Sequence, residues 1–197
     1  MAMNFKIFKD KTLVNDYIAD IIRKQIHNNP TSVLGLEMSS ELEGSYGKLV
    51  EESKEHPANY SQIYIVAINR DGNTEVFNEL DIPESQLKLE GTKESMKSVL
   101  DDKKQANLTV LSIGANKKIG YNNVEGNEQL FESREMILVA TGNDKAKAVR
   151  DLYDAAENGQ EDFAKVKKHR MVTVVMDSEA ASQLDHDIVD YYTSEFA

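Results

Sequence analysis

Hydrophobic residues near the amino terminus recur at steps of three and four, which is the spacing of one face of a helix. Asp10 or Thr12 stands at the beginning of this pattern as a candidate cap, and Pro30 lies beyond its end. The pattern therefore predicts an amphipathic helix. Its apolar positions are Leu13, Val14, Tyr17, Ile18, Ile21, Ile22 and Ile26.

Five short apolar runs later in the chain are typical of buried strands. The run 63–68 is almost wholly apolar and rich in β-branched residues, as expected of a central strand that is covered on both faces. The runs are residues 32–36, 63–68, 108–113, 136–140 and 172–176.

Helical spacing returns between these runs. The positions are Leu42, Tyr46, Leu49 and Val50; Met96, Val99 and Leu100, within 92–101; Ala146, Val149, Leu152 and Tyr153; and Ala181, Leu184, Ile188 and Tyr191. The alternation predicts an α/β fold of the Rossmann type, with three layers and a largely parallel sheet flanked by helices. At 197 residues, we expect one domain that spans residues 1–197.

Composition excludes several classes of partner. The chain is 40% hydrophobic and 29% charged, and its net charge of -11 comes with scattered basic residues, so we expect neither nucleic acid nor an anionic membrane as a partner. No apolar run is long enough to span a bilayer, and residues 1–8 do not resemble a secretory signal. With no cysteine and four dispersed histidines, we expect a cytoplasmic protein without a metal or a cofactor.

Ligands of parallel α/β proteins bind where the strands end, at their carboxyl ends. In this chain, four such strand exits are candidate sites. They are residues 37–44, 69–72, 114–123 and 141–145.

The first exit carries a resemblance to a known family. Residues 34–46, LGLEMSSELEGSY, are similar to the loop LGLATGSTPLGTY of the glucosamine-6-phosphate deaminase and isomerase family, which has the 6-phosphogluconolactonases as relatives. The resemblance implies that Ser39 and Ser40 lie in a phosphate-binding loop. Glu41 takes the place of the family's threonine, and its carboxylate repels phosphate.

Two further segments resemble catalytic motifs of the family. The strand 63–68 matches the run that ends in LDEY, which implies that Asn69 replaces an aspartate that moves a proton between sugar carbons. Residues 112–123 match GIGxDGHIAFNEP, where Asn116, Lys118 and Asn123 replace the aspartate, the ring-opening histidine and the glutamate. Because an amide is no base near neutral pH, the resemblance implies that the family's chemistry is missing.

The last exits resemble the family's VTGxxKA motif and its closing strand, at residues 139–146 and 172–181. The resemblance implies that Thr141, Gly142 and Lys145 contact phosphate. Between residues 123 and 135, the chain is too short for the family's TxGxGT excursion and its phosphate-binding arginine.

Each of these residues also has an interpretation that needs no ligand. Ser39 and Ser40 could cap a helix, and the asparagines are common turn residues. Lys117 and Lys118 could be exposed loop charges or a small anion site. Thr141 and Gly142 could simply form a strand-to-helix turn that is followed by a solvated Lys145.

Two functions stay open from the sequence. In one, the chain is a pseudoenzyme that binds a sugar phosphate or another small anion, such as an acidic metabolite. In the other, it is an active sugar-phosphate isomerase or hydrolase of carbohydrate metabolism with a rearranged site, for which Glu37, Glu41 and Asp71 are the available carboxylates. The sequence also leaves open a role in protein association only, and whether copies form a homo-oligomer.

Overall fold

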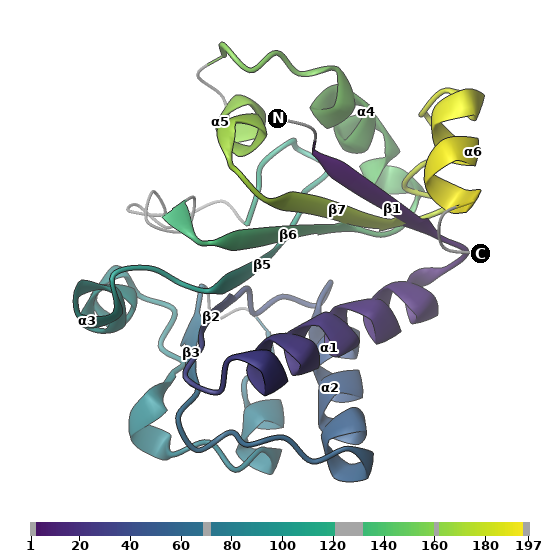
Figure 1. Cartoon of the computed structure of the whole chain (residues 1–197). Helices are drawn as coiled ribbons and strands as arrows, with labels where there is room; N and C mark the ends of the chain where they lie inside the picture. Colours follow the sequence, from purple (N-terminus) through teal and green to yellow (C-terminus); the bar gives the residue numbers. More distant parts are fainter. Residues whose placement is uncertain (1–2, 69–71, 121–131, 160–161, 195–197) are drawn as a thin grey trace.

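The computed structural model describes residues 3–68, 72–120, 132–159 and 162–194 (Figure 1). Within these ranges, seven strands form one sheet in the order β1-β7-β6-β5-β2-β3-β4, and every neighbouring pair is parallel. The strands are β1 (Asn4–Phe8), β2 (Val33–Leu36), β3 (Tyr64–Ala67), β4 (Leu87–Lys88), β5 (Leu108–Ser112), β6 (Glu135–Ala140) and β7 (Val172–Asp177).

Helices cover both faces of the sheet, which confirms the predicted three-layer α/β fold. One face packs against α1 (Lys11–Asn28), α2 (Glu43–Glu55) and the short 3-10 helix η1 (Glu75–Glu79). The other packs against α3 (Lys93–Lys103), α4 (Ala146–Asp154), α5 (Asp162–Lys168) and α6 (His186–Ser194). Two further 3-10 helices are η2 (Glu84–Gln86) and η4 (Asn143–Lys145).

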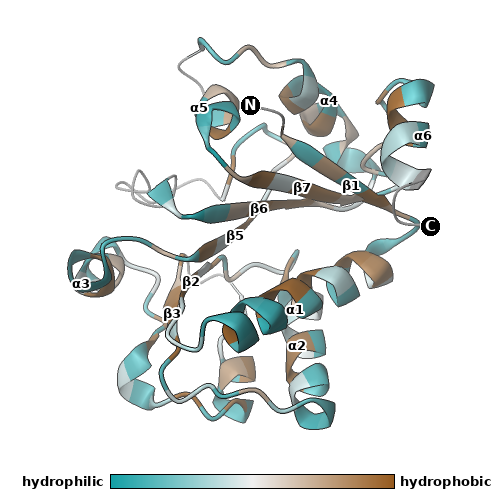
Figure 2. Ribbon diagram, in the orientation of Figure 1, coloured by the Kyte–Doolittle hydropathy of each residue, from teal (hydrophilic) through white to brown (hydrophobic). Residues whose placement is uncertain are grey.

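Hydrophobic residues, brown in Figure 2, are concentrated in the strands, and the buried ones of the strands and helices form the two core clusters that flank the sheet. Helix α1 buries Val14, Ile18, Ile22 and Ile26, as its periodicity predicts. Of its two candidate caps, Asp10 is used, because its carboxylate accepts a hydrogen bond from the Leu13 amide at 3.1 Å.

The final predicted helix was wrong in its extent. Ala181 and Leu184 are buried in a segment of turns, and α6 begins only at His186. The amides of Ile188 and Val189 in α6 donate to the Asp185 carbonyl at 3.0 Å each, so a new helix starts directly after Asp185.

The strand order places a topological switch point between β2 and β5. After β2 the chain adds β3 and β4 on one side, and it then returns to add β5 on the other. Because all pairs are parallel, the strand exits meet at one edge, which we call the carboxyl edge, opposite the amino edge where the strands begin. Strands β1, β6 and β7 run from left to right in Figure 1, so the carboxyl edge is at the right.

Candidate functional site

Glu37 follows β2 at the switch point and ties it to β5. Its carboxylate accepts hydrogen bonds from the Ser112 hydroxyl, at 2.7 Å, and from the Ser112 amide. The Tyr46 hydroxyl donates to the Glu37 carbonyl at 2.7 Å. Burial raises the pKa of Glu37 to about 6, although the bonds from Ser112 oppose the shift. Only 2% of the residue is exposed, so the carboxyl group is shielded from solvent.

Glu41 reaches across the carboxyl edge to the exit of β6. One oxygen of its carboxylate, Oε1, accepts from the Thr141 amide at 3.0 Å and also from the Thr141 hydroxyl. The Lys11 ammonium lies 3.9 Å from the other oxygen. An amide, a hydroxyl and an ammonium that surround one carboxylate are the donors that an oxyanion requires. The threonine that the family resemblance assigns to phosphate therefore holds a carboxylate of the same chain.

The neighbouring predicted contacts, Gly142 and Lys145, also meet carboxylates. The Gly142 amide donates to both oxygens of the buried Asp177, at 3.1 and 3.0 Å. Asp177 also accepts from the Ala180 amide at 2.8 Å. The Lys145 ammonium pairs with Asp144 and thereby holds the pKa of that carboxyl below its usual value. Gly142 has a φ of 88°, a value that suits glycine.

These contacts lie in a cleft of about 430 Å³ at the carboxyl edge, a volume within the range of small-molecule sites. Five carboxylates and three lysines line it, so its formal charge is negative. The lining residues are Lys9, Asp10, Lys11, Glu41, Thr141, Gly142, Asp144, Lys145, Asp177, Ser178 and Glu179. An anion that enters the cleft must therefore compete with carboxylates that already accept the hydrogen bonds of the cleft's donors.

Ser39 and Ser40 do not line this cleft, and neither side chain caps α2. The cap of α2 is Leu42, which provides no side-chain bond, so the capping interpretation was wrong. The Ser39 carbonyl accepts from the amides of Leu42 and Glu43, at 3.0 and 3.2 Å. Its hydroxyl is buried beside the Glu37 carboxylate.

Asn116 and Lys118 lie in a tight turn between Ile113 and Ile119. The Asn116 side-chain oxygen accepts from the Lys118 amide at 3.2 Å, and the Gly114 amide donates to the Lys118 carbonyl at 2.9 Å. These bonds agree with the interpretation of Asn116 as a turn residue. Lys118 is exposed, and neither residue lines the cleft.

Three candidates, Asn69, Asp71 and Asn123, lie outside the described residues. Conversely, Asp177 anchors the Gly142 turn, although it is not among the predicted site residues. The sequence does contain a signal for Asp177, because this residue directly follows the predicted strand 172–176. That strand exit is a fifth one, beyond the four named as candidate sites. In the described ranges, no three His, Asp or Glu side chains are grouped as metal ligands.

Comparison with known proteins extends over most of the chain. No model of a protein family matches it. The glucosamine-6-phosphate deaminase of Clostridium beijerinckii is 22% identical over an alignment that covers 92% of this chain and all of that protein. The deaminase of Mycoplasma mycoides subsp. mycoides is 23% identical, and the alignment covers 92% of this chain and 98% of that protein. The first alignment is 241 residues long, so the relative carries segments that this chain lacks.

Solved structures show the same fold. A monomeric glucosamine-6-phosphate deaminase superimposes with a TM-score of 0.77 at 21% identity. The superposition covers 91% of this chain and 99% of that chain. The 6-phosphogluconolactonase of Trypanosoma cruzi gives 0.70 at 14% identity, with coverage of 93% and 97%.

The fold and the cleft thus define a parallel α/β protein in which the exits of β1, β2, β6 and β7 form one candidate site. Within that class, the chain is similar over most of its length to glucosamine-6-phosphate deaminases, and it is shorter than they are. No helix in the described ranges is long and apolar enough to cross a bilayer.

Proposed function

We propose that this protein binds a sugar phosphate at the carboxyl edge and lacks the usual deaminase chemistry. The observation that carries the proposal is the set of donors around Glu41. The Thr141 amide and hydroxyl converge on one carboxylate oxygen, and Lys11 lies beside the other. A phosphate oxygen can accept the same bonds once Glu41 turns away, and proteins named as deaminases of glucosamine 6-phosphate are its relatives.

The lack of deaminase chemistry follows from the residues at the catalytic positions. Asn116, at the family's aspartate position, is an amide whose oxygen serves its own turn. Lys118, at the histidine position, is exposed. The loss of one acid or base group costs about 10²- to 10⁴-fold in rate, so two losses remove useful turnover.

Binding in this cleft has an electrostatic cost. Five carboxylates face three lysines, and the ligand must displace Glu41 from Thr141 before it can bind. The affinity is therefore weak, and it falls as salt screens the lysines. Glu41 acts as a built-in competitor for the anion.

Titration calorimetry with glucosamine 6-phosphate tests the site. Glu41→Thr removes the competitor and should tighten binding about tenfold or more, because a hydrogen bond to a charged group contributes about 1.5–3 kcal/mol. Lys145→Ala should abolish binding. Lys147→Ala is the matched control, because this exposed lysine of α4 pairs with Asp151 and does not line the cleft. Binding that ignores both Glu41→Thr and Lys145→Ala would place the ligand elsewhere.

Glu37 favours a second candidate, an active isomerase or hydrolase. A carboxyl group with a pKa of about 6 at the switch point has the proton affinity of a general acid or base near neutral pH. It is buried and bonded to Ser112, so the loop at residues 38–42 would have to open. We expect purified protein to turn over neither glucosamine 6-phosphate nor 6-phosphogluconolactone. Turnover that disappears in Glu37→Gln would establish this second function instead.

A further inference from the structure

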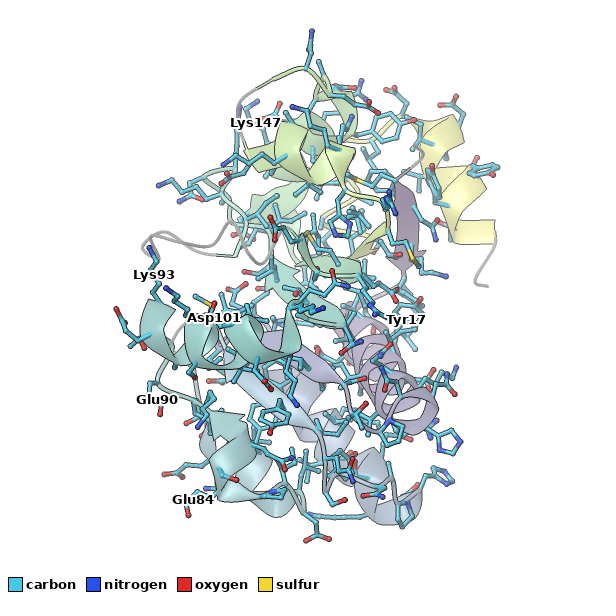
Figure 3. All side chains as sticks on the ribbon, turned by 60° about the vertical axis from the view of Figure 1, so that its left-hand side comes forward. Tyr17, Glu84, Glu90, Lys93, Asp101 and Lys147 are labelled. Carbon is cyan, nitrogen blue, oxygen red and sulfur yellow. The ribbon has the colours of Figure 1, made fainter. Side chains whose placement is uncertain are left out.

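A second pocket, of about 600 Å³, lies at the amino edge, where β6 and β7 begin. This edge is at the left of Figure 1, and it comes forward in Figure 3. The residues lie between α3 and β5, before β6, at the end of α5, and between α5 and β7. They are Gln105, Glu132, Ser133, Arg134, Lys168, His169, Arg170 and Met171.

The charge of this amino-edge pocket is opposite to that of the protein. Arg134, Lys168 and Arg170 line it with one carboxylate, Glu132, whereas the whole chain carries -11. None of the three cations forms an ion pair with a carboxylate in the described ranges. Lys168 ends α5, where its charge complements the helix dipole. That effect does not account for Arg134 and Arg170, which lie outside the helices.

His169 holds the two loops of the pocket together. The Met171 amide donates to its Nδ1 atom at 3.1 Å, so the proton of the neutral ring lies on Nε2. Nε2 in turn donates to the Ser133 carbonyl at 2.7 Å. The adjacent ladder bond, from the Met136 amide to the Met171 carbonyl at 2.9 Å, fixes the same two segments. The backbone that carries Arg134 and Arg170 is therefore positioned before any ligand binds.

Gln105 orients the guanidinium of Arg134. In the amide orientation that satisfies both groups, the Gln105 oxygen accepts from Arg134 Nε at 2.9 Å and its nitrogen donates to the Glu132 carbonyl at 3.1 Å. The remaining guanidinium N–H groups are left to bind a ligand. A planar guanidinium fork matches the oxygens of a phosphate.

From this geometry, we infer that the amino-edge pocket binds a phosphate monoester through Arg134, Arg170 and Lys168. The pocket has the volume of a small-molecule site, and Met171, 56% exposed, offers an apolar surface beside the cations. Sugar phosphates and nucleotides share the phosphate group. They differ in the part of the molecule that would contact Met171. This site is independent of the one proposed at the carboxyl edge.

Titrations followed by amide NMR test the inference with inorganic phosphate, adenosine 5′-monophosphate and glucosamine 6-phosphate. We expect all three to shift the amides of Ser133 and Met171. Tighter binding of the nucleotide than of phosphate would identify the nucleotide as the source, and tighter binding of the sugar phosphate would identify a sugar. Equal affinity would show that the pocket recognises the phosphate group alone.

Variants separate this pocket from the carboxyl edge. Arg170→Gln should weaken phosphate binding at least fivefold, and Arg134→Gln with Arg170→Gln should remove it. Lys93→Gln is the matched control, because this exposed lysine of α3 does not line the pocket (Figure 3). Lys145→Ala should also leave phosphate binding here unchanged. Phosphate that shifts neither amide at millimolar concentration, or binding that the double variant retains, overturns the inference.

Discussion

The two edges of the sheet carry opposite charge. At the carboxyl edge, five carboxylates face three lysines. Carboxylates of the chain accept hydrogen bonds from Thr141 and Gly142, and one pairs with Lys145. At the amino edge, three cations face one carboxylate and have no ion pair in the described part of the chain. At the carboxyl edge, the chain's own carboxylates thus accept the hydrogen bonds that Thr141 and Gly142 donate, whereas the cations of the amino edge have no carboxylate partner among the described residues.

Asp177→Ala gives the largest effect that we expect at the carboxyl edge. The buried carboxylate is the acceptor for the amides of Gly142 and Ala180, and its loss leaves both without that partner. A buried donor without a partner costs about 1–3 kcal/mol, so the free energy of unfolding should fall by about 3 kcal/mol. Urea denaturation at pH 7 measures the change.

Asp144→Ala is the control for this effect. Its carboxylate is 64% exposed and pairs with Lys145 at the surface, where such pairs contribute about 0–1 kcal/mol. We expect a loss of at most about 0.5 kcal/mol. Equal losses in the two variants would show that Asp177 is an ordinary surface carboxylate and not an anchor of the edge.

Glu37→Gln should stabilise the protein at neutral pH. The pKa of Glu37 is about 6 in the fold, against 4.5 ordinarily, so the folded state binds its proton more tightly than the unfolded state. Its stabilising contribution is complete below pH 4.5 and is lost as the pH rises through 6. The charged form therefore costs about 2 kcal/mol at pH 7, and glutamine removes that cost.

Urea denaturation of both proteins from pH 4 to pH 7 checks the prediction. The stability difference between variant and parent should be small at pH 4 and should grow between pH 4.5 and 6. A difference that does not change with pH would mean that Glu37 titrates normally.

The sequence predicted the central sheet well because burial imposes a simple pattern there. Strands covered on both faces need continuous apolar runs, and all five predicted runs are interior strands of the sheet, β2, β3, β5, β6 and β7. The edge strand β1, NFKIF, has alternating burial and was missed. Helix α5 was missed as well, because seven residues with three lysines carry little helical pattern.

The site was less predictable, because its contacts join residues that are far apart in the chain. Four strand exits are candidate sites, but no local pattern pairs Glu41 with Thr141, one hundred positions later. Glu41 lies outside α2, which begins at Glu43, and its carboxylate turns to Thr141 instead. The amino-edge pocket was missed because its basic residues are dispersed between elements and resemble ordinary surface charges.

His169→Ala should have a smaller effect, at the amino edge. It removes the bonds to the Ser133 carbonyl and the Met171 amide, each of which contributes about 0.5–1.5 kcal/mol, so the loss should be about 1–2 kcal/mol. His186→Ala is the control, because its side chain is 92% exposed and should change stability by less than about 0.5 kcal/mol. Equal effects in urea denaturation would mean that His169 does not hold the pocket together.

Glu132→Gln gives the smallest expected effect and tests the charge comparison directly. Glu132 is the single carboxylate of the amino-edge pocket, and it is exposed. Exposed charges interact by about 0.2–1 kcal/mol, so its removal should tighten phosphate binding about threefold at low salt. The gain should disappear in about 0.5 M salt, where the screening length is only a few ångströms. Glu90→Gln, an exposed carboxylate that does not line the pocket, should leave the affinity unchanged (Figure 3). If phosphate binding is equally tight with and without Glu132, at low and high salt, charge is not what distinguishes the two edges.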